Sequence, residues 1–168
     1  MSDQVELVTG SIAEEDADVI VNSANTDMIM GSGVAEAILG EAGSEVEEEA
    51  MAQAPVAVGD VVVTSGGDMA AKHIVHVAVV GDAEPDLYEC TRNALDAAAE
   101  LGASSVSLPA LGTGSAGMNP RESARDMLRA IRDHIEETGS DLYVRIVLWD
   151  EELYPLFQRR LERTFAHR

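Results

Sequence analysis

The sequence is poor in several residue types, and each shortage excludes a class of protein. It contains one cysteine, Cys90, so no disulfide can form within the chain. No apolar run is long enough to cross a bilayer, and the start of the chain, Met1 to Gln4, lacks the basic residues and apolar core of a signal peptide. We therefore expect a cytoplasmic protein in which Cys90 is a small core residue rather than a nucleophile.

Histidines are also few, and their spacing does not indicate a metal site. The four are His73, His76, His134 and His167. His73 and His76 fall on an expected strand, where residues three apart point to opposite faces, so they cannot bind one ion together. We expect neither a metal nor a cofactor.

Basic residues are scarce as well: 11 lysines and arginines stand against 31 acids, a formal net charge of −20, and Lys72 is the single lysine. This balance is typical of proteins from a halophilic prokaryote, because the screening length falls to about 3 Å in 1 M salt and suppresses self-repulsion. An ordinary acidic protein is the alternative. The balance argues against binding to a nucleic-acid backbone, which requires a basic stripe, since the arginines within 121–132 are interleaved with acids.

Hydrophobic periodicity divides the chain into strands that alternate with helices. Short runs of β-branched residues predict buried strands, and apolar residues with a 3.6-residue period predict helices. No linker or repeat interrupts this order, so we expect one domain, residues 1–168, of the α/β class with a mainly parallel sheet. The expected strands are 5–8, 18–21, 59–64, 74–80, 106–111 and 143–149, and the expected helices are 33–43, one that starts at a Ser44–Glu47 capping box, 85–101, 120–138 and a last one that carries Leu153 to Phe165.

Two glycine-bearing loops each join an expected strand to an expected helix. The first strand, 18–21, leads through Asn22–Asn25 and Gly31–Val34 into a helix. The second, 106–111, leads through 112–117 to Asn119, an expected N-cap in a capping box with Glu122, with Pro120 at the first helical position. Such loops direct backbone N–H groups at an anion. Glycines that only form tight turns are the alternative.

The spacing of these loops excludes two common phosphate-binding motifs. A Walker loop requires a lysine after its glycines, and no lysine follows either cluster. The dinucleotide fingerprint requires a third glycine, and Glu36 occupies that place after Gly31 and Gly33.

Four motifs, in order and spacing, resemble the macro domain family. They are Val21–Asn25, Met30–Ala35, Gly59–Thr64 and Leu108–Gly114. The resemblance implies a three-layer α/β/α sandwich with a mixed, mainly parallel sheet that binds ADP-ribose, and some members hydrolyse ADP-ribosyl derivatives. ADP-ribose or its derivatives, and ADP-ribosylated proteins, are the partners that the resemblance implies.

The resemblance also assigns roles to individual residues. Asn25 resembles the asparagine that binds the distal ribose and would position a water that the ligand's phosphate activates; a turn residue is the alternative. Asp27 is a second candidate for positioning the water, and a turn residue is again the alternative. Trp149 stands where an aromatic stacks on adenine, with core packing at a strand end as the alternative. The expected ligand contacts are Ser11, Ile12, Ala24, Asn25, Gly31, Ser32, Gly33, Val34, Leu111, Gly112, Thr113, Gly114, Ser115, Ala116, Gly117, Trp149 and Asp150.

At three positions the chain departs from the family pattern. Ser11 replaces an aspartate that accepts the adenine amino group, and Ala116 replaces an aromatic that closes over the distal ribose. Ala35 stands where a hydrolytic branch has an aspartate, and Glu36 should point about 100° away on the helix. Two functions therefore stay open. One is an enzyme for O-acetyl-ADP-ribose, ADP-ribose 1″-phosphate or mono-ADP-ribosylated acidic side chains, and the other is a reader that only binds ADP-ribose.

Overall fold

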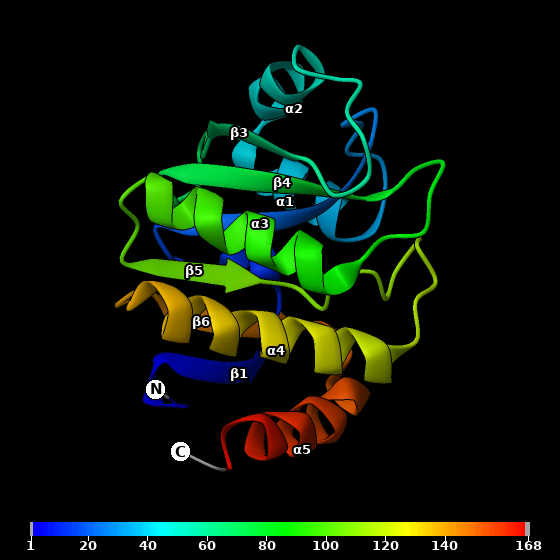
Figure 1. Ribbon diagram of the computed structural model, residues 1–168. Coiled ribbons are helices and arrows are strands. Elements are labelled where there is room, and N and C mark those ends of the chain that lie inside the picture. Colours follow the sequence, from blue (N-terminus) through cyan, green and yellow to red (C-terminus); the bar gives the residue numbers. More distant parts are fainter. Residues whose placement is uncertain (1, 167–168) are drawn as a thin grey trace.

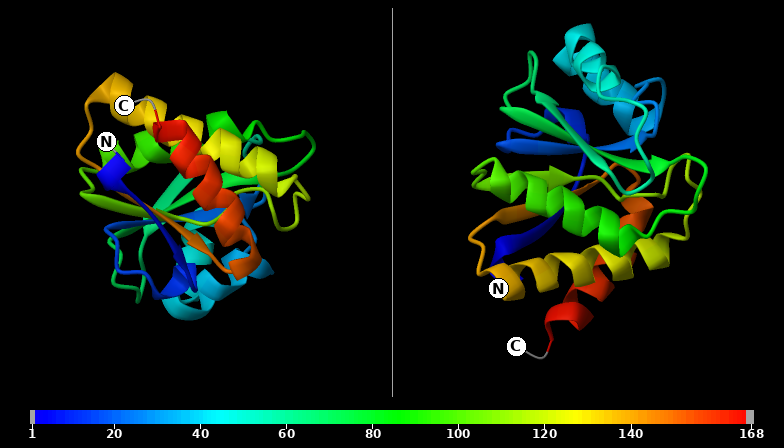
Figure 2. Two further views of the ribbon diagram at one scale, coloured as in Figure 1. Left: turned by 90° about the horizontal axis from the view of Figure 1, so that it is seen from below. Right: turned by 45° about the horizontal axis from the view of Figure 1, so that its top comes forward.

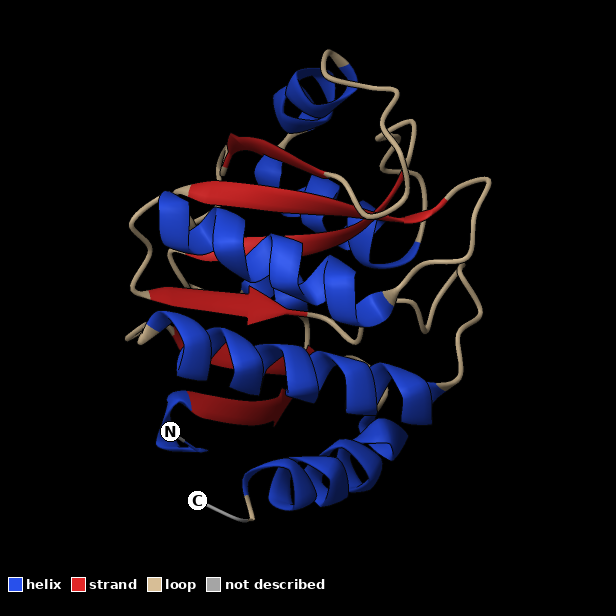
Figure 3. Cartoon of the chain, in the orientation of Figure 1, coloured by secondary structure: helices blue, strands red, loops and turns tan. Residues whose placement is uncertain are grey.

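The computed structural model describes residues 2–166, and Figures 1 and 3 show the helices and strands that the periodicity predicts. None of the helices in that range is long and apolar enough to cross a membrane. The elements are β1 (Val5–Thr9), β2 (Val19–Asn25), α1 (Gly33–Ala42), α2 (Ser44–Met51), β3 (Val61–Ser65), β4 (His73–Val80), α3 (Leu87–Glu100), β5 (Ser105–Leu108), α4 (Pro120–Thr138), β6 (Tyr143–Leu148) and α5 (Tyr154–Phe165), with short 3-10 turns at Ser2–Gln4 (η1), Ile12–Glu14 (η2) and Glu151–Leu153 (η3).

The six strands form one sheet in the order β1-β6-β5-β2-β4-β3. Every neighbouring pair is parallel except β3 and β4, which are antiparallel. The prediction of a mixed, mainly parallel sheet is therefore confirmed. Because β2 and β5 are adjacent and parallel, the two glycine loops leave the sheet at the same edge.

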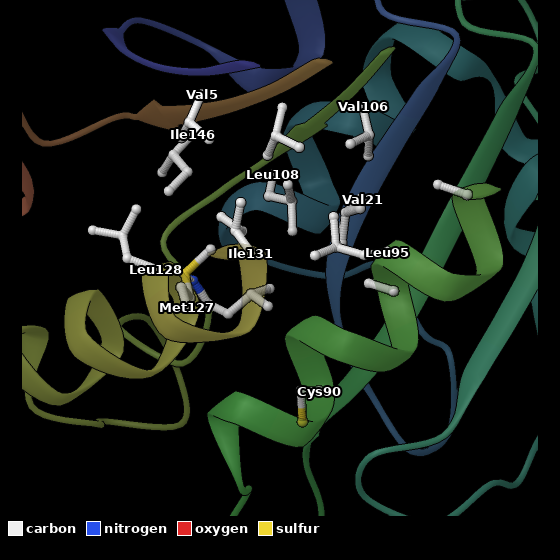
Figure 4. Packing of buried hydrophobic residues seen from close by; sticks show 14 of the residues in the cluster. Val5, Val21, Cys90, Leu95, Val106, Leu108, Met127, Leu128, Ile131 and Ile146 are labelled. Atoms are coloured by element: carbon white, nitrogen blue, oxygen red, sulfur yellow. Dashed lines mark hydrogen bonds between the residues drawn. The ribbon is translucent and has the colours of Figure 1, made fainter. Parts of the chain in front are cut away.

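Helices cover both faces of the sheet, and β2 shows why. Val19 and Val21 point into a core shared with α3, α4 and α5, whereas Ile20 between them points into a second core with α1. All three side chains are buried, as expected for a strand covered on both sides. The left view of Figure 2 shows the three layers, and Figure 4 shows Val21, Val106 and Leu108 packed against Leu95 and Ile131. Cys90 is buried in this core, as predicted.

Two strand ends differ from the prediction. The expected strand at 18–21 continues to Asn25, because Asn22, Ser23 and Ala24 go on pairing with β4. The expected strand at 106–111 stops at Leu108, since Pro109 has no N–H to donate to a neighbouring strand. The first glycine loop therefore begins after Asn25 and the second begins at Pro109, which changes the shape of the sheet edge where the two loops lie.

The helix starts differ in part as well. Asn119 caps α4 as predicted, with its Oδ1 accepting from the Arg121 N–H at 2.8 Å, but within residues 2–166 Glu122 returns no bond to it. α3 begins at Leu87, two residues after Pro85, because Asp86 is its N-cap and accepts from the Glu89 N–H.

The capping box predicted for α2 is wrong. Gly43 is the N-cap and makes no side-chain bond. Glu47 instead accepts the Met30 N–H at 2.6 Å and so ties α2 to the first glycine loop. Met51, which we expect on the inward side of this helix, is exposed because the helix ends there.

Candidate functional site

A cleft of about 740 Å³ opens where the strands β2, β5 and β6 end. Its position follows from the topology, because ligands of open α/β sheets bind beyond the carboxyl ends of the strands. The loop after β5, which joins α4 at the right of Figure 1, forms one wall. The loop after β2 and the first turns of α1 form another, so the structure brings the two glycine loops together around one cleft.

Most of the predicted site residues line this cleft. Asp27, Gly31 and four members of the second loop region do not, and the roles assigned to all of the predicted site residues stay predictions. The predicted residues that line it are Ser11, Ile12, Ala24, Asn25, Ser32, Gly33, Val34, Thr113, Gly114, Ser115, Trp149 and Asp150; those that do not are Asp27, Gly31, Leu111, Gly112, Ala116 and Gly117.

Asn25 ends β2, and its amide shapes the loop that follows. Its Oδ1 accepts the N–H groups of Asp27 at 3.0 Å and of Ile29 at 3.2 Å, and its Nδ2 donates to the Ile29 carbonyl at 2.8 Å. The turn role that the sequence leaves open is therefore present. One Nδ2 hydrogen stays available for a ligand, because an amide nitrogen carries two.

The first glycine loop presents the N-terminus of α1 to the cleft. Ser32 is the N-cap, and its side chain makes no capping bond. The N–H groups of the first helical turn, from Gly33 on, have no partner within the helix and carry the positive end of its dipole. Gly33 has φ +59°, and a Cβ built there meets nothing within 4 Å. The space in front of this segment is therefore open and is lined by backbone N–H donors, an arrangement that suits an anionic group.

In the second loop, some glycines shape the backbone while others face the cleft. Gly112 has φ +79°, and a Cβ there would lie 2.9 Å from Leu87 Cδ2, so only glycine fits without a shift. The Met118 N–H donates to the Gly112 carbonyl at 2.8 Å and the Gly117 N–H to the Gly114 carbonyl at 2.9 Å. Within residues 2–166 the N–H groups of Gly114 and Ser115 have no such partner. They are therefore available to a ligand in the cleft.

Ionisable side chains are rare in the cleft. Among the described residues that line it, Glu36 and Asp150 are the ones that carry charge, and no cationic side chain is present. Asp150 is occupied, since its Oδ1 accepts the Glu152 N–H at 2.9 Å and caps the turn after β6. An anion bound here would be held by backbone N–H groups and by the dipole of α1.

Trp149 stands at the rim of the cleft with 80% of its surface exposed. The alternative that it packs in the core is therefore excluded. Its indole face is free to stack on a planar group in the cleft.

The prediction missed part of the lining. Several of the missed residues are predictable, because ligands of open α/β sheets bind beyond the carboxyl ends of the strands. Gly10 comes directly after β1, Val80 is the last residue of β4, and Pro109 comes directly after β5. Ile29, which is 49% exposed, has no comparable signal in the sequence. The missed residues are Gly10, Ser23, Ile29, Ala35, Glu36, Ala37, Val80, Pro109, Ala110, Pro120, Val147 and Leu153.

Burial changes the pKa of two side chains outside the cleft, Cys90 and His76, by a large amount. Burial raises the pKa of the Cys90 thiol to about 11, and nearby Asp86 and Glu89 act in the same direction. The thiol is therefore protonated at neutral pH and a poor nucleophile. Burial lowers the pKa of His76 to about 4, so this imidazole is neutral. Among residues 2–166, no cluster of three or more His, Cys, Asp or Glu side chains has the arrangement of a metal site.

Comparison with known proteins agrees with this geometry. A family model for the macro domain matches residues 21–127. The chain is 40% identical over 161 residues to an uncharacterized protein of Pyrobaculum aerophilum, covering 92% of this chain and 88% of the relative. It is 35% identical over 173 residues to the O-acetyl-ADP-ribose deacetylase of Cronobacter sakazakii, covering 96% and 95%. A solved Oceanobacillus iheyensis macrodomain variant with ADPR has a TM-score of 0.88 at 32% identity, covering 96% of this chain and 94% of that chain. The chain belongs to the macro domain family.

Proposed function

We propose that this chain acts as one domain that binds ADP-ribose in the cleft and hydrolyses an ADP-ribose derivative. The observation that carries the proposal is the pair of glycine loops, whose free N–H groups face one cleft in which none of the described lining residues is cationic. Backbone donors of this kind suit a diphosphate. The relative from Cronobacter sakazakii supports deacetylation of O-acetyl-ADP-ribose as the reaction. Removal of phosphate from ADP-ribose 1″-phosphate and hydrolysis of mono-ADP-ribosylated proteins are the other candidate reactions.

Three features of the cleft support a specific orientation of the ligand. The diphosphate lies between the N-terminus of α1 and the N–H groups of Gly114 and Ser115. Adenine stacks on Trp149, with Ser11 and the Ile12 backbone beside it. The distal ribose lies near Asn25, whose remaining Nδ2 hydrogen donates to it. Backbone N–H groups also stabilise the negative charge that develops during hydrolysis.

A reader that binds ADP-ribose without turnover is the second candidate. Two observations favour it. No histidine or cysteine lines the cleft among the residues that the structure describes, and the Asn25 amide is largely occupied by the loop. Turnover assays on the three substrates, in molar KCl, separate the two functions. Tight binding of ADP-ribose without turnover of any substrate would show that the protein is a reader.

We expect calorimetric titration to rank ADP-ribose above ADP, NAD and AMP. AMP lacks the second phosphate and the distal ribose, so it loses charge-assisted hydrogen bonds worth about 1.5–3 kcal/mol each and should bind at least about tenfold more weakly. Equal affinity for AMP and ADP-ribose would contradict the placement of the diphosphate between the loops.

Trp149→Ala is the matched variant for this titration. Stacking of a base on an aromatic side chain is worth about 1–3 kcal/mol, so the variant should bind ADP-ribose about 5- to 150-fold more weakly. Since Trp149 is mostly exposed, its loss should leave the melting temperature nearly unchanged.

We also propose that the protein works in a salt-rich cytoplasm. Its net charge of −20 supports this assignment. Because salt screens the repulsion between carboxylates, thermal melting should shift to higher temperature between low and molar KCl. An unchanged melting temperature would remove the halophilic assignment and leave an ordinary acidic protein.

A further inference from the structure

We propose that Glu47 on α2 is a positioning residue for the ligand site, and that it sets the preference of the site for ADP-ribose over AMP. Glu47 is not among the residues that line the cleft. The inference rests on the proposed function and adds a residue that acts on ligand affinity from outside the cleft. It follows from the hydrogen bonds of the loop between β2 and α1 and from the packing of the two methionines in that loop.

The first half of this loop is held by the sheet and by Asn25. The Thr26 N–H donates to the Val80 carbonyl of β4 at 3.0 Å, and the Met28 N–H donates to the Asn25 carbonyl at 3.2 Å. The Asn25 side chain accepts from the Ile29 N–H and donates to the Ile29 carbonyl. The backbone is therefore fixed as far as Ile29 without any help from α2.

The second half of the loop depends on Glu47. The Met30 N–H donates to Glu47 Oε2 at 2.6 Å. After Met30, the N–H groups of Gly31, Ser32 and Gly33 have no hydrogen-bond partner within residues 2–166. These free donors lead into the end of α1 that we assign to the diphosphate. The position of Met30 therefore determines where they point, and Glu47 determines the position of Met30.

The backbone of the loop is not held in place by its own preferences. Met28 has φ +60°, a conformation that is uncommon for a residue other than glycine. The side chains of Met28 and Met30 are buried, in clusters that also contain Ala50 and Val46 of α2. Methionine is flexible and adapts to altered packing, so this burial alone does not fix the backbone. Without Glu47, the Met30 N–H loses its acceptor in a partly buried place, and the loop gains a reason to move.

Movement of the loop should weaken some ligands more than others. The apparent affinity of a ligand falls in proportion to the fraction of molecules that have the binding-competent loop. In the orientation proposed above, the diphosphate and the distal ribose lie against this loop, whereas adenine lies at Trp149. AMP has the adenine but lacks the second phosphate and the distal ribose. Loss of Glu47 should therefore weaken ADP-ribose much more than AMP.

The test is calorimetric titration of Glu47→Ala and Glu47→Gln with ADP-ribose and with AMP, in molar KCl and well below the melting temperature. We expect Glu47→Ala to bind ADP-ribose at least about tenfold more weakly and to change AMP affinity by less than about threefold. Glu47→Gln keeps an oxygen that accepts the Met30 N–H but lacks the charge that strengthens the bond. It should therefore recover most of the affinity and stay within about threefold of wild type for ADP-ribose.

Glu49→Ala and Glu49→Gln are the matched controls on the same helix. Glu49 Oε2 accepts the Ser65 N–H at 2.9 Å, and its Oε1 accepts the Ser65 hydroxyl at 2.7 Å. These variants remove the same charge and a similar bond at β3, away from the cleft. They should bind both ligands as wild type does, even where they lower the melting temperature. If Glu47→Ala does not fold, the comparison of Glu47→Gln with Glu49→Gln decides, because a selective loss of ADP-ribose affinity is expected in the first and not in the second.

The outcomes separate this inference from the proposed function. Wild type that does not bind ADP-ribose would overturn the proposed function and the role of Glu47 together. Wild-type binding that is retained in folded Glu47→Ala would overturn the role of Glu47 and leave the proposed function. An equal loss of ADP-ribose and AMP affinity, or the same loss in the Glu49 variants, would show a general disturbance of the fold and would also overturn the positioning role.

Discussion

Gly33→Glu is expected to abolish measurable binding of ADP-ribose while leaving the protein folded. A Cβ at Gly33 meets nothing within 4 Å, so the new side chain enters open space in the cleft and does not disturb the core. It places a carboxylate against the N–H groups that we assign to the diphosphate. The φ of +59° disfavours any residue other than glycine, which costs about 1 kcal/mol of stability and lowers the melting temperature by several degrees.

Two variants separate the causes in this experiment. Gly33→Ala carries the same backbone strain with only a methyl group, so it should lose less than about tenfold in affinity. Gly40→Glu adds the same charge on the same helix, where a Cβ also meets nothing within 4 Å, and it should bind normally. Calorimetric titration with ADP-ribose measures all three. Retained affinity in Gly33→Glu would place the diphosphate elsewhere.

Much of the fold was accessible from the sequence because its physical signals are local. The run at 74–80, which is apolar apart from His76, indicates a strand covered on both faces, and the stripe from Ala124 to Ile135 indicates the buried side of α4. The edge of the sheet that holds the cleft followed from the topological rule alone. One error arose because a residue has a partner far away in the sequence. Glu47 fits a capping box by its spacing, yet it bonds the Met30 N–H, 17 positions away.

The site was less predictable, and Glu36 shows the reason. A helical wheel separates neighbouring residues by about 100°, so Ala35 and Glu36 were expected to face different ways. The cleft, however, lies at the end of α1 rather than along its side. Side chains from several directions around the axis can therefore reach it, and Ala35, Glu36 and Ala37 all do. Trp149 needed the structure for a similar reason, because a tryptophan at a strand end can be buried or exposed.

A buried polar network crosses three strands of the sheet away from the cleft. Asn22 on β2 donates from Nδ2 to His76 Nδ1 on β4 at 3.0 Å, and His76 Nε2 lies 3.0 Å from Thr64 Oγ1 on β3. Since Asn22 Nδ2 can only donate, Nδ1 must accept, so the proton of the neutral ring is on Nε2 and points at Thr64. The Thr64 hydroxyl donates in turn to the Ser65 carbonyl. A second proton on the His76 ring would have to sit on Nδ1, which already accepts the hydrogen bond from Asn22, so this network disfavours the charged ring.

The ordinary pKa of His76 is 6.5, and in the folded protein it is about 4. Between these two values the unfolded chain binds a proton that the folded chain does not. We therefore expect the unfolding free energy to fall as the pH drops from 6.5 to about 4. Above pH 6.5 the ring is neutral in both states and the effect is absent. A shift of this size corresponds to about 3 kcal/mol of unfolding free energy, which is fully lost once the pH is below the folded pKa.

Denaturant unfolding at fixed KCl measures the unfolding free energy in wild type and in His76→Gln, whose side chain keeps a donor and an acceptor but does not titrate. All carboxylates are common to both proteins, including Glu49, which accepts the Ser65 N–H. The difference between the two curves therefore isolates His76, and parallel curves from pH 7.5 to 4 would show that the ring is protonated in the fold at no cost.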